Sequence, residues 1–192
     1  MHGIIGRIGW TVALAAGLAA CGSKTTVTAQ NASTAEVAEK VKDSGIADDG
    51  FISPGQWQMT MTISDMKIPG MPPQMAKQMQ GRLGQPHVSE HCVTEEESKK
   101  PKEDFFAGEQ AKSCRYENFT LGGGKIAMVM HCDSPTGGKQ TMKMDGTYSA
   151  DAYHMTVASQ VEGKAGQPMS GMTLNATMDA KRLGVCTGKQ AG

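Results

Sequence analysis

The sequence predicts an all-β domain with a minor helical part: an antiparallel meander of about seven strands, with one or two short helices. Two observations predict this class. Apolar and polar residues alternate in several stretches between residues 56 and 183, as they do in strands with one buried face. Glycine-rich turns separate the later stretches, with no crossover helix between them. One face of the sheet must be covered, so we expect it to curl into a half-barrel or small barrel, or to be crossed by residues 66–82.

Residues 1–20 are predicted to be a signal peptide. The apolar stretch Ile8–Gly17 suits a signal sequence and is too short to span a bilayer. The following Leu18-Ala19-Ala20-Cys21 resembles the bacterial lipobox, whose cysteine is acylated before cleavage. Cys21 is therefore the expected lipidation site and membrane anchor, in preference to a chance cysteine after an ordinary secretory signal. Gly22 replaces the aspartate that retains such lipoproteins at the inner membrane, which favours the periplasmic face of the outer membrane.

Residues 21–52 are predicted to be the lipidated cysteine and a flexible tether. Their residues are mostly small and polar and can bury little surface. Ser33 and Glu36 have the spacing of a capping box, which would begin a short helix through about Lys42 that stops near Gly45. Its apolar face is thin, so we expect a marginal helix within a spacer.

Residues 53–188 are predicted to be the folded domain, followed by a disordered tail at 189–192. In the first strand Trp57, Met59, Met61 and Ile63 point to one side. Prolines then end the strand, and a short helix is expected over residues 73–82. The remaining predicted elements are a strand at 87–93, a charged helical turn opened by Thr94 and Glu97 that resumes towards Phe105 and Phe106, a hairpin at 114–132, and strands at 139–149, 153–161 and 171–183.

The other four cysteines are predicted to form two disulfides, because an even number of cysteines in an exported chain is typical of a disulfide framework. If the hairpin centres on Gly123, Cys114 lies opposite Cys132. On the same side, Tyr116 then faces Met130, Asn118 faces Met128 and Thr120 faces Ile126. The expected bonds are therefore Cys114–Cys132 and Cys92–Cys186. A zinc site is disfavoured because no C-x-x-C pair occurs.

Composition and motifs exclude several functions. The 19 basic residues balance the 19 acidic ones, so nucleic acid is not an expected partner. There is no G-x-S-x-G elbow, no phosphate-binding glycine motif and no expected free thiol in the domain. We therefore expect no catalytic residues, no cofactor and no metal site, and the protein is not predicted to be an enzyme. The histidines are expected to be exposed, with His91 and His131 pointing away from the disulfides.

Several short motifs occur in an order that resembles a known family. They are Pro54-Gly55-Gln56-Trp57, Pro69-Gly70-Met71-Pro72-Pro73, Cys92-Val93-Thr94, Phe105-Phe106 before Cys114, Cys132, and a final Lys181-Arg182-Leu183-Gly184-Val185-Cys186. Over residues 52–188 the chain resembles the exported proteobacterial family catalogued as domain of unknown function 3617. The resemblance implies export, disulfides and a β-rich fold, and it implies no activity.

The chain contains 15 methionines, and their positions on the predicted strands suggest a function. M-x-M pairs on strands place both thioethers on one face, where methionine fills irregular apolar space. The sequence therefore favours a noncatalytic envelope protein that binds an apolar small molecule, a lipid or a protein segment. The predicted ligand face comprises Trp57, Met59, Met61, Met128, Met130, Met142 and Met144.

Two alternatives remain open. The protein would bind Cu(I) if its methionines act as soft ligands, in which case Met71, Met75 and Met79 should lie exposed together. It would be a purely structural envelope protein if the core is filled and holds no ligand. The sequence does not specify the oligomeric state.

Overall fold

The alternating strands form one antiparallel sheet in the computed structural model, which describes residues 25–46, 51–99, 108–133, 138–163 and 169–186. The expected signal peptide, Cys21, the Phe105-Phe106 pair and the tail at 189–192 lie outside these residues. No helix in the described part of the chain is long and apolar enough to cross a membrane.

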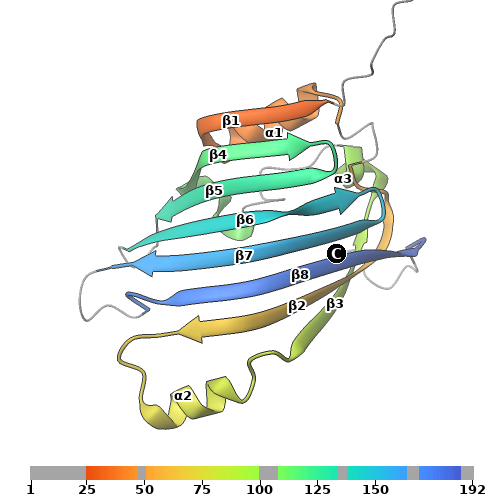
Figure 1. Cartoon of the computed structure of the whole chain (residues 1–192). Coiled ribbons are helices and arrows are strands. Elements are labelled where there is room, and N and C mark those ends of the chain that lie inside the picture. The colour runs from red at the N-terminus through yellow and green to blue at the C-terminus, as the bar shows by residue number, and fades with distance from the viewer. Residues whose placement is uncertain (1–24, 47–50, 100–107, 134–137, 164–168, 187–192) are drawn as a thin grey trace, which may run out of the picture.

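Eight strands lie side by side in the order β1-β4-β5-β6-β7-β8-β2-β3 (Figure 1). Their bounds are β1 Thr26–Ser33, β2 Gly55–Lys67, β3 Pro86–Val93, β4 Cys114–Gly122, β5 Lys125–Asp133, β6 Lys139–Ser149, β7 Ala152–Glu162 and β8 Thr173–Gly184. Strands β4 to β8 form the expected meander. The β2–β3 hairpin joins it beside β8 and β1 joins it beside β4, so the sheet is more than a meander. Within the described residues β1 and β3 do not pair with each other, so the sheet is open and the small barrel is excluded.

The predicted tether is wrong for residues 26–46. Residues 26–33 form β1, which pairs with β4 along its length. The helix α1 (Thr34–Asp43) follows directly, and its capping box is present: the Ser33 amide donates to Glu36 at 2.6 Å, and the Glu36 amide donates to Ser33 Oγ at 3.2 Å. These hydrogen bonds from Ser33 hold the pKa of Glu36 below its usual range. Val37 and Val41 bury the apolar side of α1 in the core, so a thin apolar stripe is enough to dock this helix.

Helix α1 covers one half of one sheet face, which we call the inner face because it carries Trp57, Tyr116 and Met130. The helix lies behind β1 and β4 in Figure 1. The core is concentrated under it, in side chains of β1, β4, β5 and β6, together with residues 51 and 52. The opposite face, which we call the outer face, carries Thr60, His154 and Asp179. Coverage by residues 66–82 was one of the two alternatives that the sequence offered, beside a curled sheet. Helix α2 (Pro73–Gln80) buries no residue, so that alternative is wrong.

Both predicted disulfides are present, Cys114–Cys132 and Cys92–Cys186. The first lies within the β4–β5 hairpin, where Cys114 pairs with Cys132 and Tyr116 with Met130 as expected. A register shift then occurs between Tyr116 and Asn118, so the other two expected pairs are wrong: Phe119, rather than Asn118, faces Met128, and Leu121, rather than Thr120, faces Ile126. The extra residue in β4 moves the apolar residues of the hairpin onto the inner face.

The charged helical turn is also present, as α3 (Glu95–Lys99). The Thr94 amide donates to Glu97 at 2.9 Å, and the Glu97 amide donates to Thr94 Oγ1 at 3.2 Å. A 3-10 helix, η1 (Gly108–Ser113), leads into β4. The local capping signals in this sequence therefore identify the beginning of α3 as well as that of α1.

Candidate ligand groove on the inner face

An apolar groove lies on the half of the inner face that α1 does not cover. Its volume is about 270 Å³. Strands β2, β7 and β8 supply most of the lining, with single residues from neighbouring elements. The lining residues are Ile52, Trp57, Met59, His91, Ile126, Met144, Tyr153, Met155, Met178 and Ala180. Only His91 among them carries a titratable imidazole, so the groove favours a ligand with little charge.

An aromatic cluster separates the groove from the core. Tyr153 packs against Trp57 and Phe51, with ring centroids 5.4 and 5.9 Å apart. Its hydroxyl donates to the Phe51 carbonyl at 2.9 Å, and Trp57 Nε1 donates to the Ser53 carbonyl at 2.9 Å. These bonds hold residues 51–53 against the sheet. Burial raises the pKa of Tyr153, so its hydroxyl keeps its proton at neutral pH and remains a donor.

Gly146 brings two strands close together beside the groove. This residue of β6 lies opposite Met155 of β7. A Cβ built at Gly146 would lie 2.2 Å from the His154 carbonyl oxygen and 2.8 Å from Met155 Cγ. Only glycine fits here, and the absence of its side chain gives Met155 room beside Ile126 and Met144.

The structure divides the predicted ligand face. Trp57, Met59 and Met144 line the groove as expected. Met128 and Met130 are buried in the core under α1, so their assignment to a ligand face is wrong. Met142 packs against the same core, and Met61 lies on the inner face with 36% of its surface exposed. Alternation correctly places these seven side chains on the inner face, but it does not show which half of that face the helix covers.

Sequence reasoning missed seven of the lining residues. Tyr153 and Met155 of β7, and Met178 and Ala180 of β8, belong to alternating stretches that the sequence does reveal. The prediction rested on M-x-M pairs, and neither β7 nor β8 contains such a pair. Each of these two strands contributes a single methionine to the groove. Ile52, His91 and Ile126 come from elements that meet only in the folded sheet, and no local signal identifies them.

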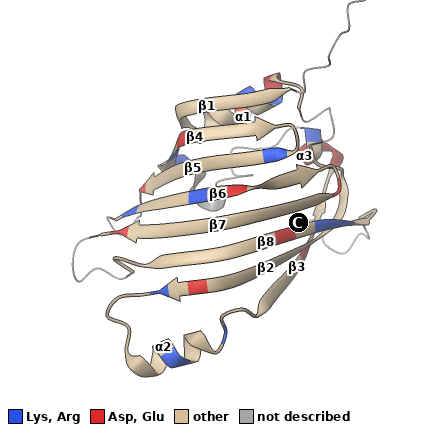
Figure 2. Cartoon of the chain, viewed as in Figure 1, with Lys and Arg blue, Asp and Glu red and all other residues tan. Residues whose placement is uncertain are grey.

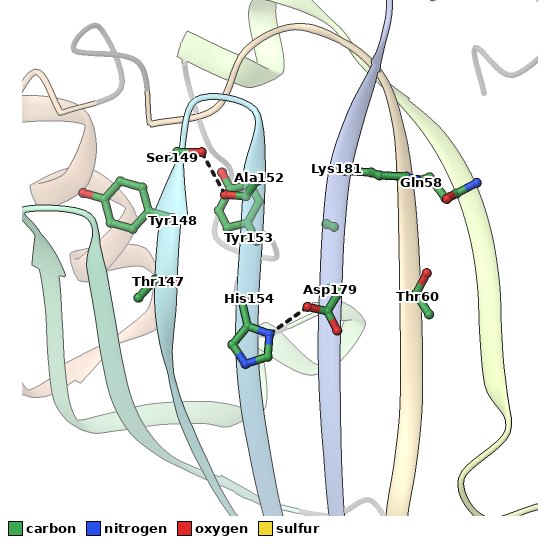
Figure 3. A pocket seen from close by; sticks show the side chains of 11 residues that line it. Gln58, Thr60, Thr147, Tyr148, Ser149, Ala152, Tyr153, His154, Asp179 and Lys181 are labelled. Atoms are coloured by element: carbon green, nitrogen blue, oxygen red, sulfur yellow. Dashed lines mark hydrogen bonds and ion pairs between the residues drawn. The ribbon is translucent and has the colours of Figure 1, made fainter.

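A second, wider hollow of about 570 Å³ lies on the outer face, where polar side chains line it together with Tyr148, Ala152, Tyr153 and Ala180. Figure 3 shows His154, Asp179 and Thr60 projecting from the adjacent strands β7, β8 and β2. His154 Nδ1 lies 2.7 Å from Asp179 Oδ1, and both side chains are more than half exposed. The two side chains therefore satisfy each other by a hydrogen bond on an open surface in solvent.

A second exposed histidine contact lies on the outer face of β4, β5 and β6. His131 Nε2 is 2.8 Å from Glu117, and Nδ1 is 3.0 Å from Thr141 Oγ1. His131 thus points away from the Cys114–Cys132 bond, as predicted. Lysine, arginine and acidic residues are scattered over the strands, and neither sign gathers in one patch in Figure 2. This distribution agrees with the balanced composition.

The methionines around α2 are only partly exposed together. Met75 is 56% exposed, whereas Met71 and Met79 are half-buried. Met75 and Met79 lie one helical turn apart. In the described part of the chain, no group of three histidine, cysteine, aspartate or glutamate residues is arranged to hold a metal ion.

The fold and the groove together define a class: a disulfide-linked, open antiparallel sheet with an apolar groove beside a helix-covered core. The chain belongs to the family described as "Protein of unknown function (DUF3617)", which matches residues 52–186. No curated protein and no solved structure matches the chain. The family match begins at residue 52, although β1 and α1 before it are part of the same sheet and core.

Proposed function

We propose that this protein is a noncatalytic binding module that holds a small apolar ligand in the groove on its inner face. The observation that carries the proposal is the groove itself, which has an almost entirely apolar lining between a packed core and an open sheet face. A purely structural protein would be expected to fill this face.

The size and lining of the groove narrow the ligand class. Its volume, about 270 Å³, lies just below the range of about 300–1000 Å³ that is usual for pockets of drug-sized ligands. It therefore suits one hydrocarbon chain or one small ring system rather than a lipid with several chains. Four methionines, Met59, Met144, Met155 and Met178, line it. Their flexible side chains can adapt to ligands of different shape.

Binding of N-phenylnaphthylamine, an apolar dye that fluoresces in apolar surroundings, tests the proposal. We expect dye binding to the full chain and displacement by dodecanoate. Ala180→Leu enlarges a side chain that lines the groove from a methyl to an isobutyl group and should weaken dye binding at least tenfold.

Ala158→Leu is the matched control, because it makes the same chemical change on the exposed outer face of the neighbouring strand β7. It should leave dye affinity unchanged. Equal loss in both variants, or no dye binding by the wild-type chain, would contradict the proposal.

We propose further that the protein works in the cell envelope, anchored by acyl chains on Cys21 to the periplasmic face of the outer membrane. Two disulfides agree with an oxidising compartment outside the cytoplasm, and the lipobox-like sequence supports the anchor. Mass spectrometry of the mature N-terminal peptide tests this: an unmodified Cys21 would exclude the anchor.

A further inference from the structure

Three methionines of the inner face lie in register across three adjacent strands. Met61 of β2 pairs with Met178 of β8, and Met178 pairs in turn with Met155 of β7. Residues directly opposite each other in an antiparallel pair have Cβ atoms about 4.5–5.5 Å apart. Met61 and Met155 therefore flank Met178 on either side, and both can lean towards it through their unbranched, flexible side chains.

We propose that Met61, Met178 and Met155 form a site for Cu(I), with the three thioether sulfurs as ligands. Thioethers are soft donors and select soft, monovalent copper over harder divalent ions. The three side chains stand on paired strands, which fix their spacing. The site overlaps the proposed ligand groove at Met155 and Met178, whereas Met61 lies outside the groove lining.

The surroundings of this row favour a soft ion. The inner-face neighbours along the same strands are Met59, Ile63, Ala176, Ala180, Tyr153 and Val157, and none of them carries a charge. A hard cation would therefore find no carboxylate there. On the next strand, β3, His87 pairs with Met61 and places an imidazole, also a ligand that copper accepts, beside the row. All four cysteines of the described sheet are in disulfides, so no thiolate in this part of the chain competes for the ion.

The row is also accessible. Met61 is 36% exposed, while Met155 and Met178 are half-buried and line the groove. An ion can therefore enter from the groove without unfolding the sheet. On α2, by contrast, Met75 and Met79 are only two thioethers on one short helix that buries no residue. The row of Met61, Met178 and Met155 supplies three sulfur donors on paired strands, whereas α2 supplies two on an exposed helix.

Silver(I) alone tests the site, because it shares the charge and softness of Cu(I) and is stable in air. The sample is the full chain with both disulfides formed and with Cys21→Ser, which removes the remaining thiol. With 13C-labelled methionine methyl groups, we expect the resonances of Met61, Met155 and Met178 to shift and to saturate at one equivalent of silver. Shifts confined to other methionines, such as Met75 and Met79, would overturn the proposal.

Met178→Leu removes the central sulfur and keeps the side-chain volume. It should lower silver affinity at least tenfold, whereas the matched variant Met75→Leu should not change it. Unchanged affinity in Met178→Leu would overturn the proposal. Met61→Leu, at a residue that does not line the groove, should also lower silver affinity and should leave N-phenylnaphthylamine binding unchanged. The copper site and the apolar groove can therefore fail independently: silver binding without dye binding would contradict only the proposed function.

Discussion

At the scale of single residues, Gly55 fixes how the first strand of the hairpin meets the last strand of the meander. Its φ of 145° is one that side-chain-bearing residues rarely adopt, and a Cβ there would lie 2.2 Å from the Gly184 carbonyl oxygen. Arg182 reinforces the contact, since its Nε donates to the Pro54 carbonyl at 2.8 Å. The Pro54-Gly55-Gln56-Trp57 motif thus has a structural reason: it brings β2 against β8.

Gly55→Ala should lower the free energy of unfolding by about 3 kcal/mol, because it combines backbone strain with a clash against backbone atoms. Urea unfolding of the disulfide-intact chain measures this. Gly45→Ala is the control: Gly45 has a φ of 71° but nothing within 4 Å of its Cβ position, so strain alone should cost about 1–2 kcal/mol. Equal losses would show that the close approach at Gly55 does not matter.

Residue alternation predicts the orientation of Trp57, Met59 and Met144 correctly. It fails at Asn118 and Thr120, because one extra residue in β4 reverses which residues face inward after Tyr116. The hydrophobic sequence of Phe119 and Leu121 is the only indication that the register changes.

At the scale of elements, β1 and α1 show how little apolar surface a segment needs in order to dock. Val27, Ala29 and Ala32 are the buried apolar residues of β1, and Val37 and Val41 are those of α1. Such a segment looks like a linker in composition. Its backbone hydrogen bonds to β4, which composition does not report, make it part of the sheet.

Val41→Ala tests whether α1 is an integral part of the fold. Val41 is 0% exposed, so its truncation should lower the free energy of unfolding by about 2 kcal/mol. Thermal or urea unfolding gives the value. Val88→Ala, at a 51% exposed position of β3, is the matched control and should change stability by less than about 0.5 kcal/mol. A loss at Val41 no larger than the control would mean that the sheet is stable without α1.

At the scale of the whole molecule, the sequence predicts the elements better than their arrangement. The bounds of β6 coincide with the predicted stretch, and β3, β7 and β8 differ from theirs by one or two residues at an end. The place of β2 beside β8 is not visible in alternation, because strands distant in sequence carry no mark of their partner. The groove depends on that placement, since β2, β8 and β7 line it together. Its existence therefore could not be read from any one strand.

The Cys92–Cys186 bond closes a long loop, because its two cysteines are 94 positions apart in sequence. Replacing both cysteines with alanine should lower the free energy of unfolding by about 4–5 kcal/mol, because the unlinked unfolded chain gains entropy. Denaturant unfolding measures the loss. Val185→Ala, at a 77% exposed neighbouring position, is the control and should have almost no effect. A loss below about 1 kcal/mol would mean that backbone pairing alone fixes β3.

The early beginning of β1 bears on how an acylated chain would stand on a membrane. Only residues 22–25 lie between Cys21 and Thr26, where the sheet begins. An extended chain of that length reaches at most about 17 Å, far less than a spacer of thirty residues. The β1 edge would therefore rest almost on the lipid headgroups. Strand β3 lies seven strands away, about 34 Å farther at 4.8 Å per strand. If Cys21 is acylated as proposed, the groove would then open well above the bilayer surface rather than against it.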